Sequence, residues 1–294
     1  MSTPSFDDRD GLIWMDGQMV PWRESKVHVL THAMHYGSAV FEGQRAYDGE
    51  VFKLEEHTSR LFESARLLDY EIPWEEEAIN QACKDVLKAN NLTNAYMRPI
   101  AWRGSEQMGV SAQATKIHVG IAAWEWPSYF TTESRMKGLN VTIAKWKRPD
   151  PETAPAKSKA AGLYMICTMS KHAAENNGFD DAMMFDWQGR VAELTGANVF
   201  FVKGNEIHTP IADCFLDGIT RRTAMELARQ RGFEIVERRI LPPEMEDFEQ
   251  AFVTGTAAEV TPLRQIGDYN FEVGAICKQL MQDYDDLVHR RQVG

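Results

Sequence analysis

The amino-acid sequence predicts an α/β protein of the α+β type, divided into two domains. Its 294 residues are enough for two domains, each with its own core. Two Asp-Gly pairs, Asp16-Gly17 and Asp48-Gly49, each lie between short apolar runs and predict β-hairpins. Between residues 53 and 70, apolar side chains recur with the helical period, which predicts an amphipathic helix in the same domain.

The first domain is expected to continue with a second helix over residues 75–90 and with strands at 95–103 and 116–124. Arg98 interrupts the first of these strands, and a charge in an apolar strand must either reach solvent or meet an acid. We therefore predict a small N-terminal domain over residues 1–127, an interdomain loop at 128–138, and a larger C-terminal domain over 139–294.

The second domain is expected to alternate strands and helices. Strands are predicted at 141–146, 234–240 and 250–254, hairpins at 181–194 and 199–209, and helices at 163–176 and from about 218 to 231. Two turns that contain glycine, at 216–220 and 255–259, leave backbone N–H groups exposed. Such turns can bind an anion such as phosphate.

Composition excludes several classes of function. A net charge of −11 and the lack of a basic tract argue against a nucleic-acid partner. The first residues show no signal-peptide pattern, and no apolar run approaches a membrane span, so we expect a cytoplasmic protein without a membrane partner. The cysteines are widely spaced and are expected to be reduced. His28, His32 and His35 lie close together without an acidic neighbour, and we expect no metal site.

The segment around Lys159 holds the strongest chemical signal. Lys159 lies among small residues, with the phenol of Tyr164 five positions later and the carboxylate of Glu193 beyond it. An amine, a phenol and a carboxylate suit an aldehyde cofactor, and pyridoxal phosphate is the one that most often binds a lysine covalently. The alternative from these residues alone is a lysine that is simply solvated.

These motifs together resemble the fold-type IV pyridoxal-phosphate enzymes, in particular the branched-chain aminotransferase family. The resemblance covers nearly the whole chain, through residues 27–37, 40–43, 96–99 and 255–262. Its most specific part is a spaced signature, matched here by Glu193, Asn198, Phe200, Thr209 and residues 218–221. The resemblance implies a two-domain fold-type IV protein whose larger C-terminal domain binds pyridoxal 5′-phosphate.

The resemblance also implies a role for single residues. Lys159 is expected to form the Schiff base and to carry the proton, Glu193 to keep the ring nitrogen protonated, and Tyr164 to bind the phenolic oxygen. Leu216 would pack on the ring. The implied cofactor-binding set is Arg60, Lys159, Tyr164, Glu193, Asn198, Leu216, Ile219, Thr220 and Thr256.

The implied substrate pocket is small and hydrophobic. Its residues would be Tyr36, Phe41, Gly43, Tyr96, Arg98, Val110, Trp126, Tyr129 and Ala257, with Tyr164 shared with the cofactor. Arg98 would bind the distal carboxylate of glutamate or 2-oxoglutarate, since a guanidinium pairs with a carboxylate through two hydrogen bonds. Arg103, on the same strand, can contribute to that binding.

The resemblance therefore implies a transaminase that moves the amino group between branched-chain L-amino acids (leucine, isoleucine, valine) and 2-oxoglutarate by a ping-pong mechanism. Its partners would be small molecules, namely amino acids and 2-oxo acids, and a homodimer or homohexamer is expected. Two alternatives stay open: a D-amino-acid transaminase or aminodeoxychorismate lyase of the same fold, and a binding protein of this fold that has lost its chemistry.

Overall fold

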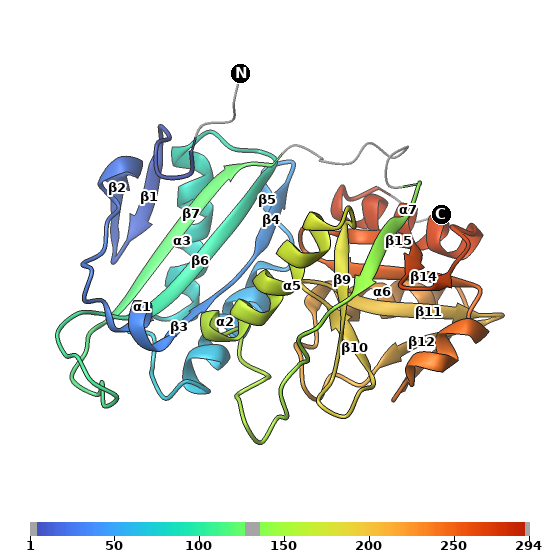
Figure 1. Cartoon of the computed structure of the whole chain (residues 1–294). Helices are drawn as coiled ribbons and strands as arrows, with labels where there is room; N and C mark the ends of the chain where they lie inside the picture. The colour runs from blue at the N-terminus through green and yellow to red at the C-terminus, as the bar shows by residue number, and fades with distance from the viewer. Residues whose placement is uncertain (1–4, 127–135, 292–294) are drawn as a thin grey trace. The chain divides into compact units, whose positions relative to one another are not determined.

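The computed structural model describes residues 5–126 and 136–291. The chain divides into two compact units (Figure 1): residues 1–127 with 158–162, and residues 128–157 with 163–294. Residues 158–162 were expected in the C-terminal domain, but they belong to the first unit because they pair with one of its strands. Ala160 bridges Val40, and the Phe41 amide donates to the Lys159 carbonyl over 3.1 Å.

The first unit is built on a seven-stranded antiparallel sheet in the order β2-β1-β7-β6-β4-β5, with β3 also paired to β6. Its strands are β1 (Leu12–Met15), β2 (Gln18–Pro21), β3 (Ala39–Phe41), β4 (Gln44–Tyr47), β5 (Glu50–Val51), β6 (Ala95–Arg103) and β7 (Ile117–Glu125). Both predicted hairpins are confirmed. Asp16, Gly17, Asp48 and Gly49 all have positive φ, as the tight turn of a two-residue hairpin requires.

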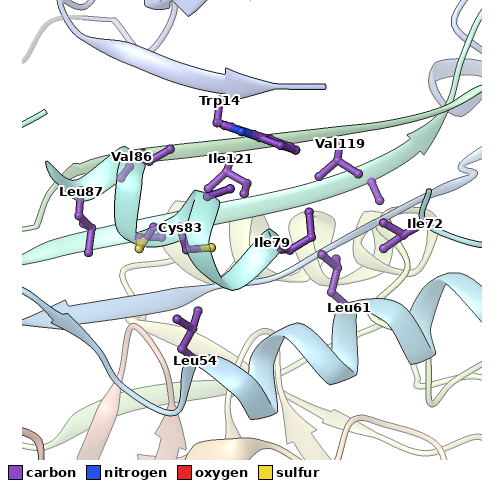
Figure 2. Packing of buried hydrophobic residues seen from close by; sticks show 14 of the residues in the cluster. Trp14, Leu54, Leu61, Ile72, Ile79, Cys83, Val86, Leu87, Val119 and Ile121 are labelled. Carbon is purple, nitrogen blue, oxygen red and sulfur yellow. The ribbon is translucent and has the colours of Figure 1, made fainter. Parts of the chain in front are cut away.

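Two helices cover one face of this sheet, α2 (Leu54–Arg66) and α3 (Glu76–Ala89). Figure 2 shows their apolar side chains, such as Leu61 and Ile79, gathered against Val119 and Ile121 of β7. Odd-numbered residues of β6 and β7 fill this core. Because side chains alternate along a strand, the even-numbered residues lie on the opposite face of the sheet. The short elements η1 (Trp22–Glu24) and α1 (His32–Tyr36) complete the unit.

The second unit contains a nine-stranded mixed sheet in the order β10-β9-β8-β15-β14-β11-β12-β13, with β16 on β15. The strands are β8 (Leu139–Ile143), β9 (Asp181–Phe185), β10 (Val191–Leu194), β11 (Asn198–Lys203), β12 (Glu206–Pro210), β13 (Glu234–Arg238), β14 (Gln250–Gly255), β15 (Glu259–Ile266) and β16 (Tyr269–Asn270). An additional pairing joins β10 to β11, so the sheet curls on itself at that point.

The helical elements of this unit are α5 (Met165–Asn176), preceded by η2 (Ala161–Tyr164), then α6 (Ile219–Gln230), η3 (Pro242–Asp247) and α7 (Ala275–Val288). A core of aromatic and aliphatic residues, including Phe201, Phe248 and Phe271, lies against the sheet. In the described part of the chain, no helix combines the length and the apolar character needed to cross a membrane.

The elements missing from the sequence prediction include α1, β15 and α7. The predicted turn after β14 is present at residues 256–258, and the chain then continues directly into β15. The buried residues of α7, Cys277, Leu280, Met281, Tyr284 and Val288, recur at helical spacing, so the sequence did hold that signal. All four cysteines are free and buried, as expected.

The core of the first unit can be tested at Leu61, which is completely buried. Replacing it with alanine (Leu61→Ala) removes packed methyl groups and leaves a cavity, and it should lower the free energy of unfolding by about 2–5 kcal/mol. Leu67, at the end of the same helix, is 40% exposed and is the matched control. Leu67→Ala should change the unfolding free energy by roughly 0.5 kcal/mol or less. Urea denaturation followed by circular dichroism measures both, and equal losses would contradict the assignment of the core.

Candidate active site

Lys159 is held at its backbone between α2 and β3 of the first unit. Its amide donates to Ser64 Oγ over 3.0 Å, and its carbonyl accepts from Phe41. The neighbouring Ser158 hydroxyl donates to the carbonyl of Ser64 over 2.9 Å. This backbone is therefore fixed, and the side chain extends until Nζ lies 5.1 Å from the centre of the Phe41 ring. Lys157, in contrast, is exposed.

The Phe41 ring also contacts Arg98. The Arg98 guanidinium carbon lies 4.7 Å from the ring centre, and Arg98 Nη2 donates to the hydroxyl of Tyr96 over 3.2 Å. The Tyr96 ring in turn packs against Trp126, with centroids 5.0 Å apart. A side chain at Gly43 would place its Cβ 2.1 Å from the Tyr96 hydroxyl, so only glycine admits this tyrosine. The structure thus brings six predicted residues together: Lys159, Phe41, Gly43, Tyr96, Arg98 and Trp126.

Two other predicted substrate residues are placed differently. Tyr36 lies on α1, where it stacks on His32 with ring centroids 4.5 Å apart, and it is 47% exposed. Val110 is 89% exposed. Neither is buried in the cluster around Phe41, and Tyr129 lies outside the described residues.

Arg103 lies on the face of β6 opposite Arg98. Arg98, Ile100 and Trp102 line a pocket of about 340 Å³ on the even-numbered face. The Arg103 guanidinium is instead buried, donating to the carbonyls of Ala112 (3.0 Å) and Asp69 (2.5 Å). Sequence reasoning allowed Arg103 to share in carboxylate binding. Its position five residues after Arg98 puts it on the other side of the sheet, where it stabilises two loops.

Arg60 forms a buried ionic cluster with two residues that sequence reasoning missed, Glu42 and His57. Arg60 Nε and Nη2 donate to the two carboxylate oxygens of Glu42 over 2.7 and 2.8 Å. His57 Nδ1 lies 2.7 Å from Glu42 Oε2. Glu42 is completely buried, so its charge depends on these partners. The signal available in the sequence was an acidic residue directly after the apolar run of β3.

The burial and the charges of this cluster set its protonation. Burial alone would raise the pKa of Glu42, but Arg60 and His57 outweigh it and hold that pKa well below its usual range. Burial lowers the pKa of His57 from 6.5 despite the nearby carboxylate. The ring is therefore neutral at pH 7, and its Nδ1–H donates to Glu42.

Glu193 is a buried carboxylate of the second unit, as Glu42 is of the first. It lies on β10 with 9% exposure. It pairs across the hairpin with Asn198, whose Nδ2 lies 3.2 Å from Glu193 Oε2 and 3.0 Å from the carbonyl of Leu216. Arg148 Nε lies 3.4 Å from Glu193 Oε1. The carboxylate is thus held from two sides, and Asn198 ties it to the turn that precedes α6. Tyr164 is half-buried at the start of α5.

The N-cap residue at the start of α6 has no side chain that could cap the first amides of the helix. Gly218 is the N-cap residue and makes no side-chain capping bond, while Ile219 and Thr220 are buried. A Cβ at Gly218 would lie 2.2 Å from Asn198 Oδ1, so the backbone can come this close only with glycine. Free N–H groups at a helix N-terminus attract an anion. The second turn, between β14 and β15, contains the half-buried Thr256 and the exposed Ala257.

The two units carry donor groups of the kinds that fit a phosphorylated aldehyde cofactor with a basic ring nitrogen. The second unit offers a buried carboxylate, a phenol and a glycine-led helix terminus, and the first offers the lysine amine. These are the groups that pyridoxal 5′-phosphate uses in proteins. The histidines of α1 are engaged otherwise: His32 contacts Ser38 Oγ at 2.7 Å and the carbonyl of Gly109 at 2.9 Å. In the described residues no group of three His, Cys, Asp or Glu side chains is arranged to hold a metal.

Comparison with known proteins decides the family. Residues 39–266 match the class IV amino-transferases. The chain belongs to this family. Among its family relatives, the branched-chain-amino-acid aminotransferase of Pseudomonas aeruginosa is 42% identical over 97% of this chain and 95% of that protein. The enzyme of the same name from Escherichia coli K12 is 35% identical, covering 94% and 92% of the two chains.

Solved structures of family members agree in fold. A branched-chain amino acid aminotransferase from T.th., with pyridoxamine 5′-phosphate bound, superposes with a TM-score of 0.94 at 36% identity, covering 97% of this chain and 96% of that one. The same enzyme with N-(5′-phosphopyridoxyl)-L-glutamate gives a TM-score of 0.92. The predicted fold class and family are confirmed.

The buried Glu42 cluster generates a prediction of pH-dependent stability. Because the folded-state pKa of Glu42 lies below its ordinary value of 4.5, its charged form stabilises the fold above that pH, and this contribution is lost as the pH falls. The lowered pKa of His57 acts in the same direction, starting near pH 6.5. Glu42→Gln should lower the unfolding free energy at pH 7 by about 3–5 kcal/mol. Below about pH 4.5 it should also weaken the pH dependence.

The matched control is Glu63→Gln, which removes an exposed carboxylate paired with Arg66 on α2. Exposed pairs contribute little, so its effect should stay within about 1 kcal/mol. Urea denaturation at several pH values measures the free energy of unfolding of both variants. A Glu42→Gln protein with the same pH profile as the unmodified chain would refute the assigned role of this carboxylate.

Proposed function

We propose that this protein is a pyridoxal-phosphate-dependent transaminase that moves the amino group between branched-chain L-amino acids and 2-oxoglutarate. The family supports the reaction class, and the names of both bacterial relatives support the substrates. The observation that carries the proposal is the pair of cations on Phe41: the Lys159 amine and the Arg98 guanidinium contact the same aromatic ring. An amine and a guanidinium, a group that can bind a carboxylate, thus lie beside one aromatic ring, which supports the proposal.

The proposed roles follow from the chemistry of each group. When bound, pyridoxal 5′-phosphate supplies the aldehyde that accepts the amino group and a ring that withdraws electrons. Lys159 Nζ would hold the cofactor through its aldehyde carbon, and the free amine would accept the proton from the substrate α-carbon. Glu193 holds the ring nitrogen in its protonated form. Tyr164 binds the phenolic oxygen, and Leu216 packs on the ring face.

The phosphate group is assigned to the glycine-led turn before α6. The amides of Ile219 and Thr220 donate to it at the helix N-terminus, whose partial positive charge favours an anion. Arg60 and Thr256 are proposed to complete this binding. The Glu42 carboxylate fixes the direction of the Arg60 guanidinium, since both of its oxygens accept from Arg60. Asn198 is proposed to act by holding Glu193 and the Leu216 carbonyl in place.

The substrate is proposed to lie on the aromatic side chains around Phe41. Phe41 and Trp126 suit an aliphatic side chain, and Tyr96 with the amide of Ala257 suits the α-carboxylate. Arg98 then distinguishes the two substrates of the ping-pong cycle, because its guanidinium can pair with the distal carboxylate of glutamate. Tyr36, Val110 and Tyr129 are proposed as pocket residues from the sequence resemblance alone. The homo-oligomeric state and the cytoplasmic location are likewise proposals.

The first test is an assay of the purified protein with L-leucine and 2-oxoglutarate. We expect glutamate to form, a visible absorbance band from the bound cofactor, and no covalent adduct in Lys159→Ala. D-Alanine as the active donor would instead identify a D-amino-acid transaminase. Release of an aromatic amine from aminodeoxychorismate would identify a lyase. A protein without the absorbance band and without turnover would be a binding protein of this fold.

A second test addresses Arg98. Arg98→Met replaces the arginine with an unbranched side chain that is apolar, and so removes the guanidinium. A hydrogen-bonded charge is worth about 1.5–3 kcal/mol, so kcat/KM for 2-oxoglutarate should fall roughly tenfold to a hundredfold. The half-reaction with L-leucine is the internal control and should change little, because leucine has no distal carboxylate. Equal losses for both substrates would place Arg98 outside substrate discrimination.

A further inference from the structure

Arg148 is a buried arginine that the proposed function does not use. It follows β8 and is 4% exposed, and its amide donates to the carbonyl of Phe185 over 2.8 Å. Its guanidinium contacts three groups of the second unit. Nε lies 3.4 Å from the Cys214 carbonyl and 3.4 Å from Glu193 Oε1, and Nη1 lies 3.5 Å from Cys167 Sγ.

Among these contacts in the described part of the chain, Glu193 is the negatively charged one. Burial raises the pKa of Cys167 to about 11 and that of Cys214 to about 12, so both thiols are neutral at physiological pH. Asp186 pairs with Arg148 only through the backbone, and its carboxylate accepts from the amides of Gln188 and Arg190. A buried guanidinium needs a counter-charge, and here the Glu193 carboxylate supplies it.

We propose that Arg148 is a positioning residue that keeps Glu193 negatively charged, and thereby fixes the proton shared by Glu193 and the cofactor ring on the ring nitrogen. The inference rests on the proposed function, which assigns Glu193 to that nitrogen. It concerns where one proton lies: on the carboxylate, with a neutral ring, or on the nitrogen, with a charged ring.

The direction follows from electrostatics in a buried site. Glu193 is 9% exposed, and burial disfavours the charged form of a carboxylate, so the ionised form depends on positive charge close to it. The amide of Asn198 donates to Glu193 Oε2 but carries no net charge. The guanidinium at Oε1 does carry one and lies directly against the carboxylate, whereas a ring nitrogen bound by Glu193 would lie beyond that carboxylate. It therefore favours the ionised carboxylate and leaves the proton on the nitrogen.

The test is NMR of the holoenzyme loaded with pyridoxal 5′-phosphate that is isotope-labelled at the ring nitrogen. The chemical shift of this nitrogen differs between the neutral and the protonated ring, and it is read without turnover. We expect the unmodified protein to show a protonated ring and Arg148→Gln to shift toward the neutral value. Arg103→Gln is the matched control, since it removes another buried guanidinium, bonded to backbone carbonyls of the first unit. It should leave the shift unchanged.

The outcomes separate this proposal from the proposed function. If Arg148→Gln keeps the protonated shift while Glu193→Gln loses it, Arg148 has no influence on the proton and the inference is overturned, while Glu193 retains its role. If Glu193→Gln also keeps the protonated shift, the assignment of Glu193 itself fails. Should Arg148→Gln not fold in thermal melts, Arg148→Met fills the same space beside Cys167 and is read in the same way.

Discussion

Each unit of this protein buries a carboxylate, and the cost of burying that charge determines which residues surround it. Glu42 is met by Arg60 and His57, and Glu193 by Arg148 and Asn198. Removing one partner of such a pair leaves the other charge unpaired in a medium that solvates it poorly. The two clusters therefore fix the conformation of Arg60 and Glu193, the two side chains in them that are proposed to bind the cofactor.

Along β6, side chains alternate between the core face and the face that carries the residues proposed to bind substrate. Met97 and Ala101 face α2 and α3 and belong to the core, whereas Tyr96 and Arg98 lie on the opposite face. The same rule explains why two arginines five residues apart differ in role. Arg98 contacts the Phe41 ring, and Arg103 binds backbone carbonyls on the core side. A one-residue shift of register would exchange these faces, so the packing of the helices also fixes the position of Arg98.

The sequence was sufficient to predict features that depend on neighbouring residues. It was insufficient for contacts between residues far apart in the chain. Hairpin turns at Asp16 and Asp48 and the amphipathic α2 follow from spacing and turn chemistry, and the structure contains them all. The pairs Glu42 with Arg60 and Arg148 with Glu193 join residues 18 and 45 positions apart, and no periodicity indicates such contacts. Motif resemblance identified Glu193, Asn198 and Arg60 but not the charged partners Arg148 and Glu42, because a motif marks single positions and carries no information on which charges are neutralised.

The spacing of the signature itself has a physical cause. Glu193 and Asn198 are five residues apart because they are cross-strand partners in a tight hairpin, closed by the Leu194 amide donating to the Ala197 carbonyl over 2.8 Å. Thr209 donates to the Val199 carbonyl over 2.9 Å and lies 3.4 Å from Arg221 Nε. Arg221 is buried and also binds Asp217 at the turn before α6. The signature is thus one connected set of contacts from the buried carboxylate to the helix N-terminus. A substitution of Asn198 should disturb both Glu193 and the turn at Leu216, because the Asn198 amide donates to each of them.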